Sequence, residues 1–167
     1  MNFKKIISNV KVKTPSSNAP SYFEDFRDNH CKTENAKSLM NYMIVADSKV
    51  DIFEHFGVTS LLEIMFLATL KEYGAKNIGL NLCKYSVELA EDLKSGIDVE
   101  KFLFEGEPTP QLVSALWTGR NSQSIGSKLG FEVVYQESYK NFTFNGKSFA
   151  ERVGDLDLVY HVASKRI

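Results

Sequence analysis

The chain has 167 residues, within the usual size of one domain of about 100–200 residues. Its hydrophobic share of 43% and charged share of 25% are those of a globular protein, which excludes a disordered or fibrous chain. Twenty Lys and Arg residues against 21 Asp and Glu give a net charge of −1. Because no basic excess is present to neutralise a phosphate backbone, we expect no nucleic-acid partner.

The sequence also predicts no membrane-spanning segment, no metal site and no disulfide framework. The longest apolar runs fall far short of the roughly 20 residues of a membrane span, and the N-terminus does not resemble a signal peptide. Cys31 and Cys83 are too few for a disulfide framework, and the three histidines are scattered without metal-ligand spacing. The composition therefore predicts a soluble, cytoplasmic protein with no metal site and no membrane partner.

The first third of the chain predicts one strand and two helices. Residues 5–13 alternate loosely and predict a strand, and the proline- and serine-containing residues 14–21 predict a loop. Thr33 is a candidate N-cap for a helix that runs to about residue 46. A second, short helix is expected over residues 50–55.

The middle of the chain predicts a buried strand, a turn and a long helix. Leu61–Leu70 is almost continuously apolar, which is typical of a central strand buried on both faces, although it contains Glu63. A glycine-containing turn over residues 71–79 follows. Apolar residues then recur at helical spacing from Ile78 until Gly96 ends the pattern.

The last third predicts a further strand, a short helix and three more strands. The expected elements are a short strand or loop at 102–104, a buried strand at 112–117, a helix at 121–129 capped by Asn121 or Ser122, a strand at 131–135, a hairpin at Asn145-Gly146 and a final strand at 156–162. This alternation indicates one mixed α/β domain over residues 1–167.

The turn at residues 71–79 is a candidate phosphate site. A turn that opens a helix presents unpaired backbone N–H groups and the positive end of the helix dipole. Gly74 and Gly79 allow a close approach to the backbone, and Lys76 adds a positive charge. The spacing matches neither a P-loop nor a dinucleotide fingerprint. An ordinary strand–helix connection with two glycines is the alternative interpretation.

Two stretches together resemble the GNAT superfamily of N-acetyltransferases. The first comprises Glu63–Thr69 (EIMFLAT) and Tyr73–Gly79 (YGAKNIG), and the second comprises Leu112–Thr118 (LVSALWT) and Lys128–Phe131 (KLGF). The tail, with Tyr139, Phe144–Lys147 and His161, is similar to the insect arylalkylamine N-acetyltransferase-like branch. The resemblance implies the GNAT α/β (α+β) fold, with a mixed central sheet, helices on both faces and two central strands that splay apart.

The resemblance also implies acetyl-CoA as acetyl donor and a small amine, such as an arylalkylamine, as acceptor, without a metal. It places the pantetheine on the backbone of Leu67, Ala68 and Thr69 and the pyrophosphate on Gly74, Ala75, Lys76, Asn77, Ile78 and Gly79. The loop departs from the family pattern, because Gly74 replaces an Arg or Gln, and Ala75 and Asn77 replace glycines. We expect the affinity for the donor to be weakened by these changes, and not abolished.

For catalysis, the resemblance implies Glu63 as the general base that accepts a proton from the amine. Burial in an apolar strand is expected to raise the pKa of this carboxyl. A structural carboxylate that faces a solvated edge or pairs with a lysine is the alternative. The usual tyrosine acid is replaced by Gly126, so Thr118 and Ser122 are the candidate proton donors to the thiolate. Ser122 has the alternative role of a helix cap.

The resemblance further implies that the domain is incomplete at its N-terminus, because residues 5–13 correspond to the third strand of the family. The first strand and two helices, which build much of the amine pocket, are expected to be missing. A catalytically impaired or inactive relative that at most binds acyl-CoA is therefore the alternative to an active enzyme. A sheet without its first strands exposes an edge and apolar surface, from which instability, dimerisation or a partner is expected. We expect a monomer or a weak homodimer.

Overall fold

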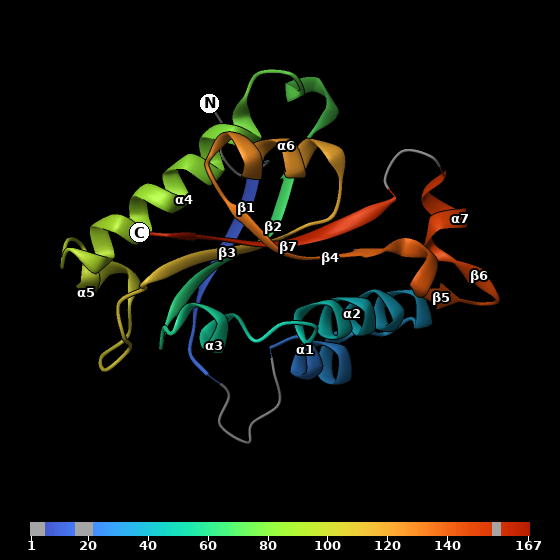
Figure 1. Ribbon diagram of the computed structural model, residues 1–167, viewed down its shortest axis with the longest axis horizontal. Coiled ribbons are helices and arrows are strands. Elements are labelled where there is room, and N and C mark those ends of the chain that lie inside the picture. Colours follow the sequence, from blue (N-terminus) through green and yellow to red (C-terminus); the bar gives the residue numbers. More distant parts are fainter. Residues whose placement is uncertain (1–5, 16–21, 155–157) are drawn as a thin grey trace.

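The computed structural model describes residues 6–15, 22–154 and 158–167 and contains a mixed five-stranded sheet (Figure 1). β2 and β3 are parallel, and the other neighbouring strands are antiparallel. In spatial order the strands are β1 (Ile6–Lys13), β2 (Leu61–Thr69), β3 (Leu112–Trp117), β7 (Val159–Arg166) and β4 (Glu132–Ser138).

Helices pack on both faces of the sheet, as Figure 1 shows. One face carries α1 (Tyr22–His30), α2 (Glu34–Asp47), α3 (Ile52–Phe56) and α7 (Phe149–Val153). The other face carries α4 (Ile78–Lys94), α5 (Val99–Phe102) and α6 (Arg120–Lys128). Each face has its own hydrophobic cluster, one around Tyr160 and Met43 and the other around Cys83 and Trp117. The predicted α/β architecture is confirmed.

Local sequence signals set several helix boundaries, and the predicted cap at Thr33 is confirmed. The Thr33 hydroxyl accepts the N–H of Ala36 at 3.2 Å and so caps α2. Asp51 caps α3 through the N–H of Glu54 at 3.0 Å. Gly57 ends α3 with φ +61, a left-handed conformation that glycine adopts without strain. No helix of the described ranges is long and apolar enough to cross a lipid bilayer.

The predicted hairpin turn at Asn145-Gly146 is confirmed. It joins β5 (Thr143–Phe144) to β6 (Lys147–Ser148), and the two turn residues have φ values of 48 and 72. Positive φ at both central residues is the requirement of a type I′ turn. Ser148 then caps α7, since its hydroxyl accepts the N–H of Glu151 at 3.2 Å. The hairpin and α7 thereby form one small unit beside α2.

Four predicted elements differ from the structure. Of the two alternatives at 102–104, the strand is not observed, because Phe102 ends the helix α5 and residues 103–104 lie in the loop that follows. The helix α6 begins at Arg120 after the N-cap Gly119, and neither Asn121 nor Ser122 occupies the cap position. β4 begins one residue later and ends three residues later than expected, and β7 ends four residues later. Residues 156 and 157 of the predicted final strand fall outside the described residues. The helices α1 and α7 were not predicted, because both are short and most of their residues are polar or charged.

Candidate functional site

The central parallel strands β2 and β3 separate in the middle of the sheet. Their register comprises only Leu62–Val113, Glu63–Ser114 and Ile64–Ala115, although β2 continues to Thr69 and β3 to Trp117. β1 stays paired with the opposite edge of β2 as far as Thr69. The edge of β2 that faces β3 is therefore without a strand partner beyond Ile64 within the described chain, and its backbone groups can bind another extended molecule.

A cleft of about 910 Å³ lies where the two strands separate. This volume is in the range of small-molecule binding sites, about 300–1,000 Å³. Its walls come from β2, β3, α2, α4, α6, α7 and their connections: Leu39, Tyr42, Met43, Ile64, Met65, Phe66, Leu67, Thr69, Gly79, Leu116, Trp117, Thr118, Gly119, Arg120, Asn121, Ser122, Ile125, Tyr139, Phe149 and Val153.

The cleft passes through the sheet from one face to the other. On one side its walls include Gly79 of α4 and Ile125 of α6. On the other side they include Met43 of α2 and Phe149 of α7. These helices cover opposite faces of the sheet (Figure 1). The cleft is therefore bordered by side chains from both faces of the sheet.

Two glycines shape the wall on the side of α4 and α6. A Cβ at Gly79 would lie 3.3 Å from Cδ1 of Ile125 and 3.5 Å from Cδ2 of Leu67, so glycine permits close packing there. A Cβ at Gly126 would lie 2.4 Å from Nε1 of Trp117, a distance that real Cβ atoms do not show. The Trp117 indole thus occupies the space into which a side chain at position 126 would project. Its buried N–H has no hydrogen-bond partner within the described part of the chain.

The residues predicted to bind the donor are only partly brought together. Leu67, Thr69 and Gly79 line the cleft, whereas Ala68 and residues 74–78 do not. Ala75 and Asn77 both have φ +57, so the loop keeps a left-handed backbone at the two positions where the family pattern has glycines. The ammonium of Lys76 lies 5.5 Å from the ring centroid of Tyr73.

Both candidate proton donors, Thr118 and Ser122, line the cleft. The Ser122 hydroxyl accepts the N–H of Gly119 at 3.1 Å and donates to the Gly119 carbonyl at 2.9 Å. It therefore stabilises the first turn of α6 from the third position of the helix. The side chain of Thr118 is exposed, and its carbonyl accepts a hydrogen bond from the hydroxyl of Tyr139 at 2.7 Å.

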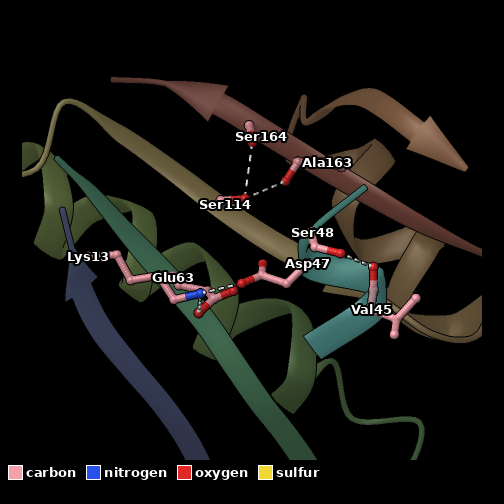
Figure 2. A network of polar contacts seen from close by, with 8 residues as sticks. All are labelled: Lys13, Val45, Asp47, Ser48, Glu63, Ser114, Ala163 and Ser164. Carbon is pink, nitrogen blue, oxygen red and sulfur yellow. Dashed lines mark hydrogen bonds and ion pairs between the residues drawn. The ribbon is translucent and has the colours of Figure 1, made fainter. Parts of the chain in front are cut away.

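Glu63 lies beside the cleft and does not line it. Its side chain is 7% exposed, and a carboxylate oxygen lies 2.7 Å from the ammonium of Lys13. The same ammonium lies 3.0 Å from Asp47, and Figure 2 shows the three side chains converging from β1, β2 and α2. Burial by itself would lower the pKa of Lys13, but the two carboxylates outweigh that effect and raise it. Glu63 is thus paired with a lysine, which was the alternative to a general base in the sequence-based prediction.

Two buried serines on the neighbouring strands form a second, separate group of polar contacts (Figure 2). Ser114 is the register partner of Glu63 on β3, and the hydroxyl of Ser164 on β7 donates to the Ser114 hydroxyl at 3.1 Å. Because Glu63 and Met65 are two residues apart on one strand, they point to the same face of the sheet. Met65 belongs to the cleft wall, so the carboxylate is one side chain away from it.

The sequence analysis missed Tyr42, Tyr139 and Arg120 as cleft residues. The Tyr42 hydroxyl lies 3.4 Å from that of Tyr139, and burial raises the pKa of Tyr42 strongly. Tyr42 could have been found from the apolar spacing of its helix, since Leu39 and Met43 lie on the same face. Tyr139 was named only as part of the tail that resembles the insect branch, and no local pattern placed it on the cleft wall.

The cleft offers few groups for acid–base chemistry. Its ionisable lining side chains, within the described residues, are two tyrosines and one arginine, with no carboxylate or imidazole among them. Cys83 belongs to the core cluster below α4, where burial raises its pKa to about 11 and keeps the thiol protonated near neutral pH. No group of three or more His, Cys, Asp or Glu side chains in the described ranges is placed to hold a metal ion.

Solved structures of N-acetyltransferases match this arrangement. The mosquito arylalkylamine N-acetyltransferase-like 5b matches with a TM-score of 0.71 and 15% identity, over 97% of this chain and 68% of that one. The chain has the GNAT fold. Arylalkylamine N-acetyltransferase 2 from Aedes aegypti matches with a TM-score of 0.69 and 18% identity, over 98% and 68%. The polyamine N-acetyltransferase of Drosophila melanogaster matches with 0.66 and 16%, over 96% and 68%.

Sequence comparison alone gives no such relationship. No protein-family description matches the chain, and no curated protein sequence matches it. The GNAT fold accounts for the expected separation of the central strands, which is confirmed by the three-residue register of β2 and β3.

Proposed function

We propose that this protein is an acetyl-CoA-dependent N-acetyltransferase that acts on a small amine such as an arylalkylamine. The observation that carries the proposal is the cleft that crosses the sheet between β2 and β3. A group transfer between two substrates needs a place where both meet, and walls on both faces of the sheet let each substrate contact a different face. The matched solved structures are N-acetyltransferases, which supports the same reaction class.

On this proposal the donor lies on the α4 and α6 side. The amide groups of its pantetheine arm pair with the unpartnered backbone edge at Leu67–Thr69, as a further strand would. Its pyrophosphate lies on the loop Gly74–Gly79 at the N-terminus of α4, where backbone N–H groups and the helix dipole favour an anion. Gly79 keeps the loop close to the cleft.

The reaction is a direct transfer in which the neutral amine attacks the thioester carbonyl carbon. The C–N bond forms, the C–S bond breaks, and the CoA thiolate leaves. Thr118 or Ser122 on the cleft wall supplies a proton to that thiolate. Glu63 is our candidate base, and because Lys13 holds its carboxylate one side chain away from the cleft, the amine proton reaches it through water.

Titration calorimetry with CoA and acetyl-CoA tests the donor site, and a thiol-release assay with benzylamine, phenethylamine and agmatine tests transfer. We expect both donor forms to bind and at least one amine to release CoA. If neither CoA nor acetyl-CoA binds at millimolar concentration, the proposal is wrong.

The catalytic role of Glu63 has a matched control. Glu63→Gln should lower kcat by about a hundredfold, the lower end of the range for acid–base groups, with unchanged donor affinity. Lys13→Met breaks the same ion pair and keeps the carboxylate. If Lys13→Met lowers kcat as much as Glu63→Gln does, the loss comes from breaking the ion pair, and Glu63 is not the catalytic base.

A second candidate function is acyl-CoA binding without transfer. Two observations favour it. Glu63 is already ion-paired with Lys13. The described residues that line the cleft include no carboxylate and no imidazole. Donor binding in calorimetry without thiol release from any amine would favour this alternative.

A further inference from the structure

The end of the molecule formed by α5 and the turn at residues 103–107 exposes three large apolar side chains. Ile97, Phe102 and Phe104 are 51%, 54% and 81% exposed, and Phe104 is the most exposed large hydrophobic residue of the described chain. α5 lies past the C-terminal end of α4 (Figure 1), whereas the cleft borders the first turn of α4 at Gly79. Because α4 has 17 residues, about 25 Å separate this end from the cleft.

The backbone at Leu103 explains why two phenylalanines are exposed together. Leu103 is extended, with φ −112 and ψ 143, and its side chain packs against the core cluster beneath α4. Successive residues of an extended backbone point to opposite sides, so Phe102 and Phe104 both point away from that core. The N–H of Phe104 donates to a carboxylate oxygen of Glu107 at 2.9 Å, and the N–H of Glu107 donates to the Phe104 carbonyl at 3.0 Å. A closed turn therefore holds the exposed ring in place.

Exposed acidic side chains lie on the same elements as these apolar residues. Residues 88–107 contain seven Asp or Glu and two Lys, a net charge of −5 in a chain whose total is −1, so the remaining residues together carry +4. The negative charge of the protein is thus concentrated at this end. We call the fully exposed acidic residues the acidic rim: Glu91, Asp92, Asp98, Glu100, Glu105 and Glu107.

This charge decides among the possible occupants of the apolar surface. The phosphates of a nucleic acid and the headgroups of an anionic membrane are repelled by it. A second copy in a two-fold symmetric contact would place −5 against −5. A contact with the positive remainder of another copy would be head-to-tail and would continue as an open chain. Charge complementarity remains for a positively charged partner.

We propose that this end of the molecule docks a basic amphipathic segment of another protein. The apolar side chains of the segment pack on Ile97, Phe102 and Phe104, and its lysines and arginines face the acidic rim. Aromatic residues at the centre and polar residues around them are the usual composition of a protein–protein interface. Exposed apolar groups of this kind mark such interfaces. The described residues of this end line no part of the cleft, so the contact is independent of the proposed reaction.

Fluorescence anisotropy with labelled peptides tests the proposal. The peptide KLAKLAKKLAKLAK presents lysines and, at helical spacing, leucines. The peptide ELAELAEELAELAE reverses its charge, and KSAKSAKKSAKSAK lacks its large apolar side chains. We expect the first peptide to bind in the micromolar range and the other two about tenfold more weakly or less. The affinity of the first should fall as salt is added, because salt screens exposed charges.

The apolar contribution has a matched pair of variants. Phe104→Ser should weaken binding of the first peptide by about tenfold, as expected for an aromatic residue at the centre of an interface. Tyr85→Ser also removes an exposed aromatic ring, 65% exposed, but from the first half of α4. It should leave the affinity unchanged. Both side chains are exposed, so thermal unfolding and CoA titration should give wild-type values for both variants.

The charge contribution has a second matched pair. The double variant Glu91→Lys with Glu100→Lys changes the acidic rim and should weaken the first peptide severalfold. Glu54→Lys with Glu132→Lys makes the same change of net charge at exposed positions of α3 and β4 and should have little effect.

The proposal is wrong if the first peptide does not bind at millimolar concentration, or if either Phe104→Ser or the Glu91 and Glu100 double variant leaves its affinity unchanged. Tighter binding of phosphatidylserine vesicles or of single-stranded DNA than of this peptide would also overturn it. Sedimentation of the full chain tests the remaining occupant. A dimer that Phe104→Ser dissociates would assign this end to a second copy and reject the basic partner.

Discussion

The ammonium of Lys13 lies 2.7 Å from the carboxylate of Glu63, and the pair joins the edge strand β1 to the central strand β2. Asp47 at the end of α2 contacts the same ammonium at 3.0 Å. One lysine thereby connects three elements at the point where the sheet begins to open. Its removal would leave the 7%-exposed Glu63 side chain without the charge that now faces it.

Lys13→Met should destabilise the protein by about 3 kcal/mol, because removing one partner of a buried ion pair leaves an uncompensated charge. Urea unfolding at pH 7 measures the loss. The double variant Lys13→Met with Glu63→Met should recover much of it, since both charges are then absent. A single variant within about 0.5 kcal/mol of the wild type, the usual effect of a neutral surface change, would contradict this expectation.

The same pair predicts an alkaline effect. The pKa of Lys13 is raised above 10.5 in the folded protein, so its contribution is fully present below that pH and is lost as pH rises through the folded pKa. The stability difference between wild type and Lys13→Met should therefore shrink above pH 10.5. A difference that stays constant up to the pH of general unfolding would show that the ion pair is not its source.

At acid pH, Glu137 should govern part of the stability. Hydrogen bonds from Asn141 and Tyr160, together with Lys49, hold the pKa of this carboxyl below its usual 4.5. The contribution is present above pH 4.5 and is lost as pH falls through the lowered pKa. Glu137→Gln should flatten the stability curve below pH 4.5 in urea unfolding. Unchanged acid dependence in that variant would exclude Glu137 as the titrating group.

Ala75→Gly should stabilise the protein by about 1 kcal/mol, because alanine is strained in the left-handed conformation that it adopts there. Asn77→Gly should stabilise it less, since asparagine tolerates this conformation. Both variants should tighten CoA binding if the loop holds the pyrophosphate, as measured by calorimetry. Asn145→Gly also replaces a residue with positive φ, but it lies in the hairpin and should leave CoA affinity unchanged.

Gly126→Ala should destabilise the protein by about 1–3 kcal/mol, because its Cβ would lie 2.4 Å from Trp117 Nε1. Trp117 is the only tryptophan, so its fluorescence reports the displacement directly. Ser124→Ala, an exposed change on the same helix, should leave both stability and emission near the wild type. Unaltered emission in Gly126→Ala would mean that the indole does not need this glycine.

The sequence could predict the fold wherever a local signal is strong. The Thr33 cap and the Asn145-Gly146 turn were both predicted, since these residues act through hydrogen bonds and backbone angles of their immediate neighbours. α1 was missed because only Phe23 of its residues with described burial is fully buried, so tertiary packing stabilises a helix that lacks an apolar stripe.

The candidate site was predicted less completely, because a cleft is formed by residues far apart in the sequence. Leu67, Thr69 and Gly79 were found from one contiguous motif. Tyr42 and Tyr139 meet across 97 positions, and no local pattern links them. Pairing of Glu63 with a lysine was one of the alternatives, but the sequence did not indicate which lysine. Its identity as Lys13 depends on the register of β1 against β2.

The short register between β2 and β3 has a mechanical consequence. Three residue pairs join the two-stranded part β1–β2 to the three-stranded part β3–β7–β4. The sheet therefore consists of two parts joined by backbone pairing only at Leu62–Ile64, and each part keeps its own strand pairing independently of this connection. An extended ligand seated along the open edge would close the gap and connect both parts.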